Sequence, residues 1–267
     1  MIGIGLGLSF IKGGGNSAEA LAWKTNIEAN GGTISQALLD IFDTNFFIPA
    51  KANGNILTEL DRLNIYCGLV GYEIAARTNL IKNAHYVTPV SSPTFDNTGY
   101  RSSGTSYLDL NYNASSQGVK YTRNSASYGY FVNNPTYSTQ RRAIGAANSG
   151  PTIRADIQRD TPGNSGQIND IIASTDTNKP TGKVFSAIIR TSSNSTKLIT
   201  NATETSGTAS STGLVNFNVF ELCLNFAGTP TSPFDTASHL ASFHGSGALD
   251  YTTLRTLLNN TFTALGV

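Results

Sequence analysis

The chain has 267 residues, of which 39% are hydrophobic and 13% are charged, with a formal net charge of +1 at pH 7. This length suits one large domain or two smaller ones, and the hydrophobic content is enough to build a buried core. The low charge argues against nucleic acid as a partner, because phosphate binding needs clustered Lys and Arg, and Arg141-Arg142 is the only adjacent basic pair.

The first ten residues, MIGIGLGLSF, alternate between apolar residues and glycine or serine. Side chains alternate between the two faces of a strand, so one face of this segment carries Ile2, Ile4, Leu6, Leu8 and Phe10. The run is too short for a membrane helix, which needs about 20 apolar residues. We expect residues 1–15 to form an arm that docks in a partner chain or a second copy. The alternative is an ordinary first strand of the domain.

Small amphipathic helices are predicted for residues 16–78, where short apolar stripes are separated by Gly turns. Capping-box spacing starts one helix at Asn16 and another at Thr33. Leu60 and Leu63 fall in a third, short helix. We expect this segment to form a helical collar.

From residue 79 onward, short alternating runs are separated by clusters of Gly, Pro, Asn and Ser, which predicts an all-β sandwich or barrel over 79–267. The candidate strands are 105–112, 126–133, 151–158, 182–190, 195–202 and the clearest, VFELCLNFAG, at 219–228. The chain then ends in an amphipathic helix, with Asp250 as its N-cap and a core-facing stripe of Leu254, Leu257, Leu258, Thr261, Phe262 and Leu265.

Catalytic motifs are not found in this sequence. Glycosidases generally need two carboxylates that flank the scissile bond, but the only glutamates after residue 79 are Glu204 and Glu221. The aspartates are scattered singly, with Asp156 and Asp160 near enough in sequence to share a site. The histidines and cysteines lack metal-ligand spacing. We therefore predict no enzyme activity, no metal and no cofactor.

A binding surface is suggested by the distribution of tyrosines. Tyrosine combines an apolar ring with a hydroxyl group, which suits sugars and protein interfaces alike, although it is also an ordinary strand residue. Seven of the eleven tyrosines lie close together in the sequence and are the candidate glycan- or partner-binding residues: Tyr100, Tyr107, Tyr112, Tyr121, Tyr128, Tyr130 and Tyr137.

The segments GTSYLDLNY, GKVFSAIIR and FELCLNFAG, followed by a closing helix, resemble the concanavalin A-like, laminin-G-like jelly roll over about residues 80–267. With the Gly-rich arm and FHGSGALDYTTLRTLLNNTFTALG, the chain also resembles virion proteins of tailed bacteriophages. This resemblance implies a mainly-β jelly-roll sandwich in a non-enzymatic virion protein of tail, fibre or head decoration, assembled in the host cytoplasm. Its partners would be other virion proteins and copies of itself, without nucleic acid or membrane. The alternative is a lectin-like module that attaches to a host-surface glycan.

Overall fold

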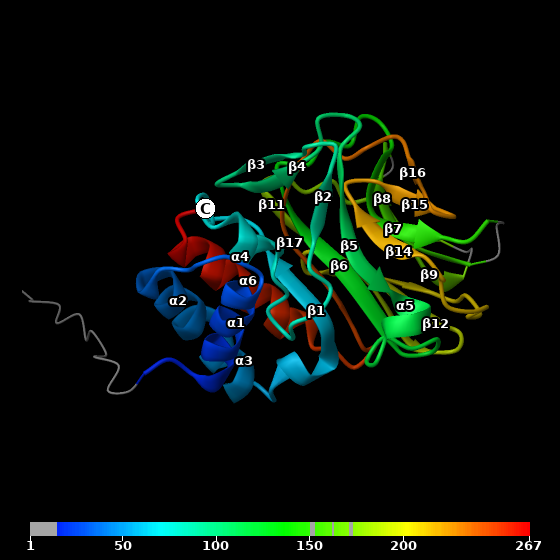
Figure 1. The fold of residues 1–267 in the computed structure, drawn as a ribbon. Helices are drawn as coiled ribbons and strands as arrows, with labels where there is room; N and C mark the ends of the chain where they lie inside the picture. The colour runs from blue at the N-terminus through cyan, green and yellow to red at the C-terminus, as the bar shows by residue number, and fades with distance from the viewer. Residues whose placement is uncertain (1–14, 150–152, 162, 171–172) are drawn as a thin grey trace, which may run out of the picture.

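Alternating apolar and polar residues form the strands of two β-sheets that pack face to face, with a group of helices against one of them (Figure 1). The structure, a computed structural model, describes residues 15–149, 153–161, 163–170 and 173–267. The arm residues Ile2, Ile4, Leu6, Leu8 and Phe10 lie outside the described residues. Nearly all strand pairs are antiparallel, so the predicted mainly-β sandwich is confirmed.

Sheet A has the strand order β13-β12-β11-β6-β17-β4-β3, and β1 also pairs with β17. Its strands are β1 (Leu60–Ile65), β3 (Thr94–Asp96), β4 (Gly99–Arg101), β6 (Ala126–Asn133), β11 (Lys183–Ser192), β12 (Ser195–Thr200), β13 (Thr203–Gly207) and β17 (Ser238–Gly245).

Sheet B has the order β10-β9-β8-β7-β14-β5-β2, and the hairpin β15–β16 joins it at β7. Its strands are β2 (Thr88–Val90), β5 (Tyr107–Asn113), β7 (Arg141–Ala147), β8 (Arg154–Arg159), β9 (Asn164–Asp170), β10 (Ser174–Asp176), β14 (Asn218–Glu221), β15 (Leu224–Phe226) and β16 (Thr229–Thr231). The single strand expected at 219–228 is divided into β14 and β15, because Leu222 adopts a φ of 71° between them. As a result β14 pairs antiparallel with β7, whereas β15 pairs parallel with it.

The helical elements are α1 (Ala18–Ala29), α2 (Gln36–Phe42), the π-helical η1 (Asp43–Phe47), α3 (Ile48–Ala52), the 3₁₀-helix η2 (Ile56–Glu59), α4 (Glu73–Arg77), α5 (Ala114–Gln117) and α6 (Tyr251–Ala264). The first two begin one and two residues later than expected, since Ser17 and Ser35 accept the capping bonds. Asp250 caps α6 as predicted. None of the helices in the described ranges has the length and apolar content needed to cross a membrane.

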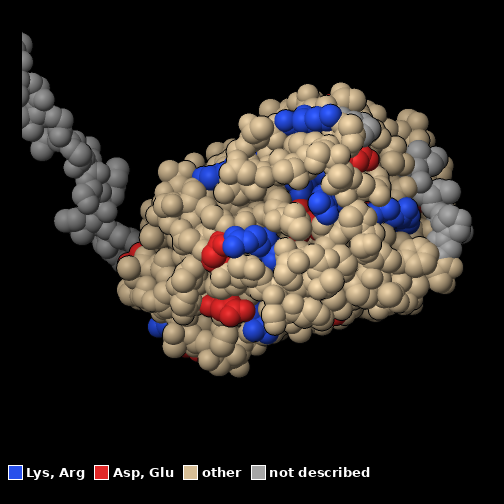
Figure 2. All heavy atoms as spheres, turned by 90° about the horizontal axis from the view of Figure 1, so that it is seen from above, with Lys and Arg blue, Asp and Glu red and all other residues tan. Residues whose placement is uncertain are grey.

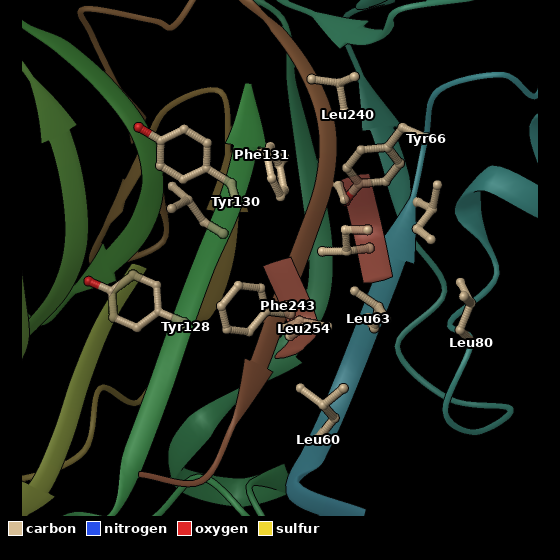
Figure 3. Close-up of a cluster of buried hydrophobic side chains, with 14 of the residues drawn as sticks. Leu60, Leu63, Tyr66, Leu80, Tyr128, Tyr130, Phe131, Leu240, Phe243 and Leu254 are labelled. Carbon is tan, nitrogen blue, oxygen red and sulfur yellow. The ribbon is translucent and has the colours of Figure 1, made fainter. Parts of the chain in front are cut away.

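The third helix predicted from Leu60 and Leu63 is wrong beyond Glu59, because both leucines lie in strand β1. A bulge between Leu60 and Arg62 shifts the pairing of β1 with β17 by one residue. The bulge places Leu60 and Leu63 on the same face of the strand (Figure 3), so their spacing imitates that of a helix.

The helices and the sandwich share one buried hydrophobic cluster. In Figure 1, α1–α3 and α6 gather on the side of sheet A that faces away from sheet B. The ring of Phe131 on β6 lies 5.1 Å from that of Phe262 on α6, and Trp23 of α1 stands 4.6 Å from Phe42. Figure 3 shows Phe131 on one side of β6 and Tyr128 and Tyr130 on the other. Among the described residues, the predicted collar is therefore continuous with the core of the sandwich.

Candidate functional site

The outer face of sheet B carries none of the helices that cover sheet A (Figure 1). In strand β5 the residues alternate between half-buried and fully buried. Leu108, Leu110 and Tyr112 enter the core, whereas Asp109 and Asn113 face outward. A sheet face of this kind can present hydrogen-bonding groups to a ligand without loss of core packing.

A cavity of about 330 Å³ opens on this face, between β5, the start of β14 and the hairpin β15–β16. Asparagine is the most frequent residue in its lining. We call it the asparagine cavity, and it is lined by Asp109, Asn113, Asn216, Phe217, Asn218, Phe220, Asn225 and Gly228.

Hydrogen bonds hold the walls of the asparagine cavity in place. The Asn218 amide donates to both carboxylate oxygens of Asp109, at 3.1 and 3.3 Å. The Asn225 amide donates to the backbone carbonyl of Asn218 at 2.7 Å, and its side-chain oxygen accepts from the Gly228 backbone N–H at 2.7 Å. Gly228 supplies the positive φ of 91° in the hairpin turn. The cavity is thus preformed, which lowers the entropy cost of binding.

The remaining groups give the cavity both polar and aromatic character. The Asn113 amide donates to Asn216 at 3.3 Å, and Asn216 is exposed. Phe217 is half-buried, and the Phe220 ring packs against Tyr107 with 4.5 Å between centroids and 33° between the ring planes. A few converging donors and acceptors beside an aromatic surface are typical of small-ligand sites.

Five of the seven candidate tyrosines are core residues and cannot contact a glycan in this structure. Tyr100, Tyr112, Tyr121, Tyr128 and Tyr130 are at most 1% exposed. Four of the five hydroxyl groups find partners inside, and that of Tyr112, for example, donates to Asp61 at 3.0 Å, whereas the hydroxyl of Tyr130 is buried without a hydrogen-bond partner among the described residues. Burial raises the pKa of each of these hydroxyls. Tyr107 and Tyr137 are half-buried, and Tyr107 alone borders the asparagine cavity through Phe220.

A charged network lies between the two sheets, where we expected only isolated carboxylates. His239 Nδ1 lies 2.8 Å from Glu221 Oε1, and its Nε2 lies 3.1 Å from Asp235 Oδ2. Glu221 Oε2 also accepts hydrogen bonds from Tyr66 and Ser242, each at 2.7 Å. His239 and Glu221 are fully buried, as is Asp235 to within 1%. The arrangement resembles a catalytic triad in composition, but its burial indicates a structural role.

These buried groups predict a maximum of stability near pH 6.5. Burial lowers the pKa of His239, but its bonds to Asp235 and Glu221 outweigh this and the net pKa is raised. Burial, reinforced by the charge of Arg62, lowers the pKa of His244 well below its ordinary value. As pH rises above 6.5, the unfolded chain therefore loses the His239 proton before the native state does. As pH falls below 6.5, the unfolded chain binds a proton at His244 before the native state does, and the same holds for His85, whose pKa burial also lowers. The free energy of unfolding therefore falls by up to about 1.4 kcal/mol per pH unit for each group, above pH 6.5 because of His239 and below pH 6.5 because of His244 and His85.

Denaturant unfolding at pH 5 to 8 measures this dependence. The variant His244→Phe should flatten the acid side of the curve. Stability that rises steadily from pH 6.5 to pH 8 in the unmodified protein would contradict the assignment of His239.

Asp156 lies too far from Asp109 and from Asp160 for either pair to act as the two carboxylates of a glycosidase. Strand pairing places Asp109, Phe220, Gly145 and Asp156 side by side on four successive strands. Three inter-strand steps separate the two aspartates by about 14 Å, and Asp160 follows Asp156 by four residues, about 13 Å along a strand. Catalytic carboxylates lie about 5–10 Å apart. Within the described part of the chain, moreover, no group of three His, Cys, Asp or Glu side chains could hold a metal ion.

Solved structures establish the fold. Domain 4 of an extracellular arabinanase from Geobacillus stearothermophilus, solved with arabinotriose, matches with a TM-score of 0.51 and 16% identity over 74% of this chain and 98% of that one. The receptor-binding domain of botulinum neurotoxin D matches with a TM-score of 0.51 and 10% identity, over 76% of this chain and 53% of that one. A sialidase from Trypanosoma rangeli matches with a TM-score of 0.50 and 12% identity, over 82% of this chain and 38% of that one.

No protein-family model matches the sequence, and no curated protein sequence matches it. The chain folds as a jelly-roll sandwich of two antiparallel sheets. The fold implied by the resemblance in the sequence is therefore confirmed.

The asparagine cavity was not predicted from the sequence. Asp109 was grouped with the scattered aspartates, and the asparagines come from β5, the segment before β14 and the turn of the β15–β16 hairpin. One signal was present: YLDLNYN at Tyr107–Asn113 alternates so that Asp109 and two asparagines share the outward face. Sequence alone does not show that the distant hairpin closes over that face.

Proposed function

We propose that the protein is a non-enzymatic carbohydrate-binding module that holds a glycan in the asparagine cavity. The observation that carries this proposal is the hydrogen-bonded set of Asp109, Asn218 and Asn225 in a preformed cavity on the uncovered face of sheet B. Carboxylate and amide groups match sugar hydroxyls, which both donate and accept, and Phe217 supplies an apolar surface. The arabinanase domain solved with arabinotriose has the same fold, which supports a glycan as the ligand.

Replacement of Asp109 by Asn or of Asn218 by Ala should weaken glycan binding about tenfold, because each removes a hydrogen bond involving a charged or pre-aligned group. A glycan array identifies the ligand, and titration calorimetry then measures its affinity for each variant. Both side chains are half-buried, so the melting temperature should change little.

The matched control is Asn97→Ala, since Asn97 is an exposed asparagine in the turn between β3 and β4 of sheet A. Unchanged affinity in both cavity variants, with a ligand that binds the unmodified protein, would overturn the cavity as the binding site. Release of shortened sugars from the ligand would instead show an enzyme.

A location in a phage particle remains a second proposal, based on the resemblance in the sequence alone. In it, the arm of Ile2, Ile4, Leu6, Leu8 and Phe10 docks in another virion protein or a second copy, and the sandwich displays the glycan site to the host. Virion and lectin functions are compatible, because attachment to a host glycan needs both an anchor and a binding site. Mass spectrometry of purified phage particles is the direct test.

A further inference from the structure

Two arginines converge on one aspartate on the outer face of sheet B. Arg142 of β7 and Arg154 of β8 donate to Asp156 Oδ2 at 2.7 and 3.2 Å. The side chain of Asp156 is 3% exposed, whereas those of Arg142 and Arg154 are 19% and 24% exposed. The Asp156 carboxylate thus pairs with two guanidinium groups, and both guanidinium groups lie nearer to the solvent than the carboxylate. A net positive charge remains at this point of the surface.

The two guanidinium groups retain unused hydrogen-bonding capacity. Each guanidinium carries five N–H donors in a planar fork that matches carboxylate and sulfate groups, and each gives one hydrogen bond to Asp156. Arg154 Nε is buried and has no hydrogen-bond partner in the described residues. An anion that bound here would therefore find donors already held in position by Asp156.

Neutral polar groups continue from this pair along the same face. Arg142 faces Gln158 across the β7–β8 ladder. Gln140 donates to Gln158 at 3.0 Å, and Gln158 donates to Ser165 of β9 at 2.8 Å. Figure 2 shows that charged side chains form small, separate patches on a mostly uncharged surface. A localised positive charge among amides and hydroxyls suits a glycan with a few charged substituents better than a polyanion such as nucleic acid.

The arginine pair and the asparagine cavity belong to one face of sheet B. The cross-strand row that runs from Asp109 through Phe220 and Gly145 ends at Asp156. Gly145 is required in this row, because a Cβ atom there would lie 2.4 Å from that of Asp156. The two sites are about 14 Å apart, so one ligand can reach both only if it is an oligosaccharide.

We propose that Arg142 and Arg154 form a subsite for an anionic substituent of the glycan, a carboxylate or a sulfate, so that the module prefers acidic oligosaccharides to neutral ones. This inference rests on the proposed function and specifies its ligand class. Asp156 positions the two guanidinium groups and at the same time competes with the ligand for them.

Titration calorimetry with three probes of equal length tests the subsite: an oligogalacturonate, a sulfated galacto-oligosaccharide and the neutral galacto-oligosaccharide. We expect one acidic probe to bind about tenfold more tightly than the neutral one, and the stronger of the two identifies carboxylate or sulfate. The preference should shrink as salt is raised, because ions screen exposed charges. Arg142→Gln and Arg154→Gln should each remove most of it and leave binding of the neutral probe unchanged.

Asp156→Asn separates a binding role from a structural one. If the arginines only stabilise the sheet, this variant weakens binding or changes nothing. If they hold an anion, the loss of the competing carboxylate should strengthen acidic-probe binding severalfold. Arg101→Gln is the charge-matched control, because Arg101 pairs with Asp96 on sheet A.

Equal binding of acidic and neutral probes, with no effect of the arginine variants, overturns the subsite but leaves the glycan-binding function intact. Absence of binding to every probe and to the whole glycan array overturns both.

Discussion

Replacement of Glu221 by Ala is expected to destabilise the fold by about 3–5 kcal/mol, the cost of breaking a buried ion pair by removal of one partner. Three donors depend on this carboxylate: His239, Tyr66 and Ser242. Without it, the hydroxyl groups lose a buried acceptor, and His239 keeps only Asp235 as a carboxylate partner, which also pairs with the buried Arg159. Urea unfolding monitored by circular dichroism measures the loss.

Glu204 provides the matched control for this substitution. It is exposed and pairs with Lys197 at 2.8 Å, and exposed pairs contribute about 0–1 kcal/mol. Glu204→Ala should therefore cost less than about 1 kcal/mol. A similarly small cost for Glu221→Ala would show that the inter-sheet network adds little to stability.

Replacement of Trp23 by Ala should cost about 3–5 kcal/mol, the usual range for loss of a buried tryptophan. Trp23 is fully buried and packs its ring 4.6 Å from Phe42 and 6.0 Å from Phe47. Its indole N–H also donates to the Thr78 carbonyl at 3.4 Å. Because the helices share one core with the sandwich, the whole protein should unfold in one transition at lower denaturant concentration.

Leu21→Ala is the control on the same helix, since Leu21 is 47% exposed and should cost little. Two separate transitions in Trp23→Ala, with the β-sheet signal unchanged, would show instead that residues 16–78 form an independent collar.

Elements with a simple period were predictable from the sequence. The alternation of β5 and the 3.6-residue stripe of α6 follow directly from which side chains are buried, and Asp250 caps α6 through the backbone N–H groups of Thr252 and Thr253. Strand β1 was not predicted because all of its residues are buried and it carries a bulge. Its sequence therefore lacks the alternation of apolar and polar residues that indicates a half-exposed strand.

The functional surface was less predictable for a physical reason. Most of the buried tyrosines bond through their hydroxyl groups to residues that are distant in sequence, as Tyr112 does to Asp61, so the sequence does not show which tyrosines enter the core. The asparagine cavity likewise depends on the fold of the β15–β16 hairpin over β5. The resemblance to jelly-roll proteins gave the architecture, but the position of the site followed only from the structure.

Binding of a glycan in the asparagine cavity can be observed directly by an NMR titration with the best glycan of the array. The side-chain amides of Asn113, Asn216, Asn218 and Asn225 give signals that report on the cavity walls. We predict that these signals and the backbone amides of β5 and β14 shift in proportion to bound ligand. Saturable shifts confined to the helices or to sheet A, with the cavity amides unchanged, would show that the glycan binds elsewhere.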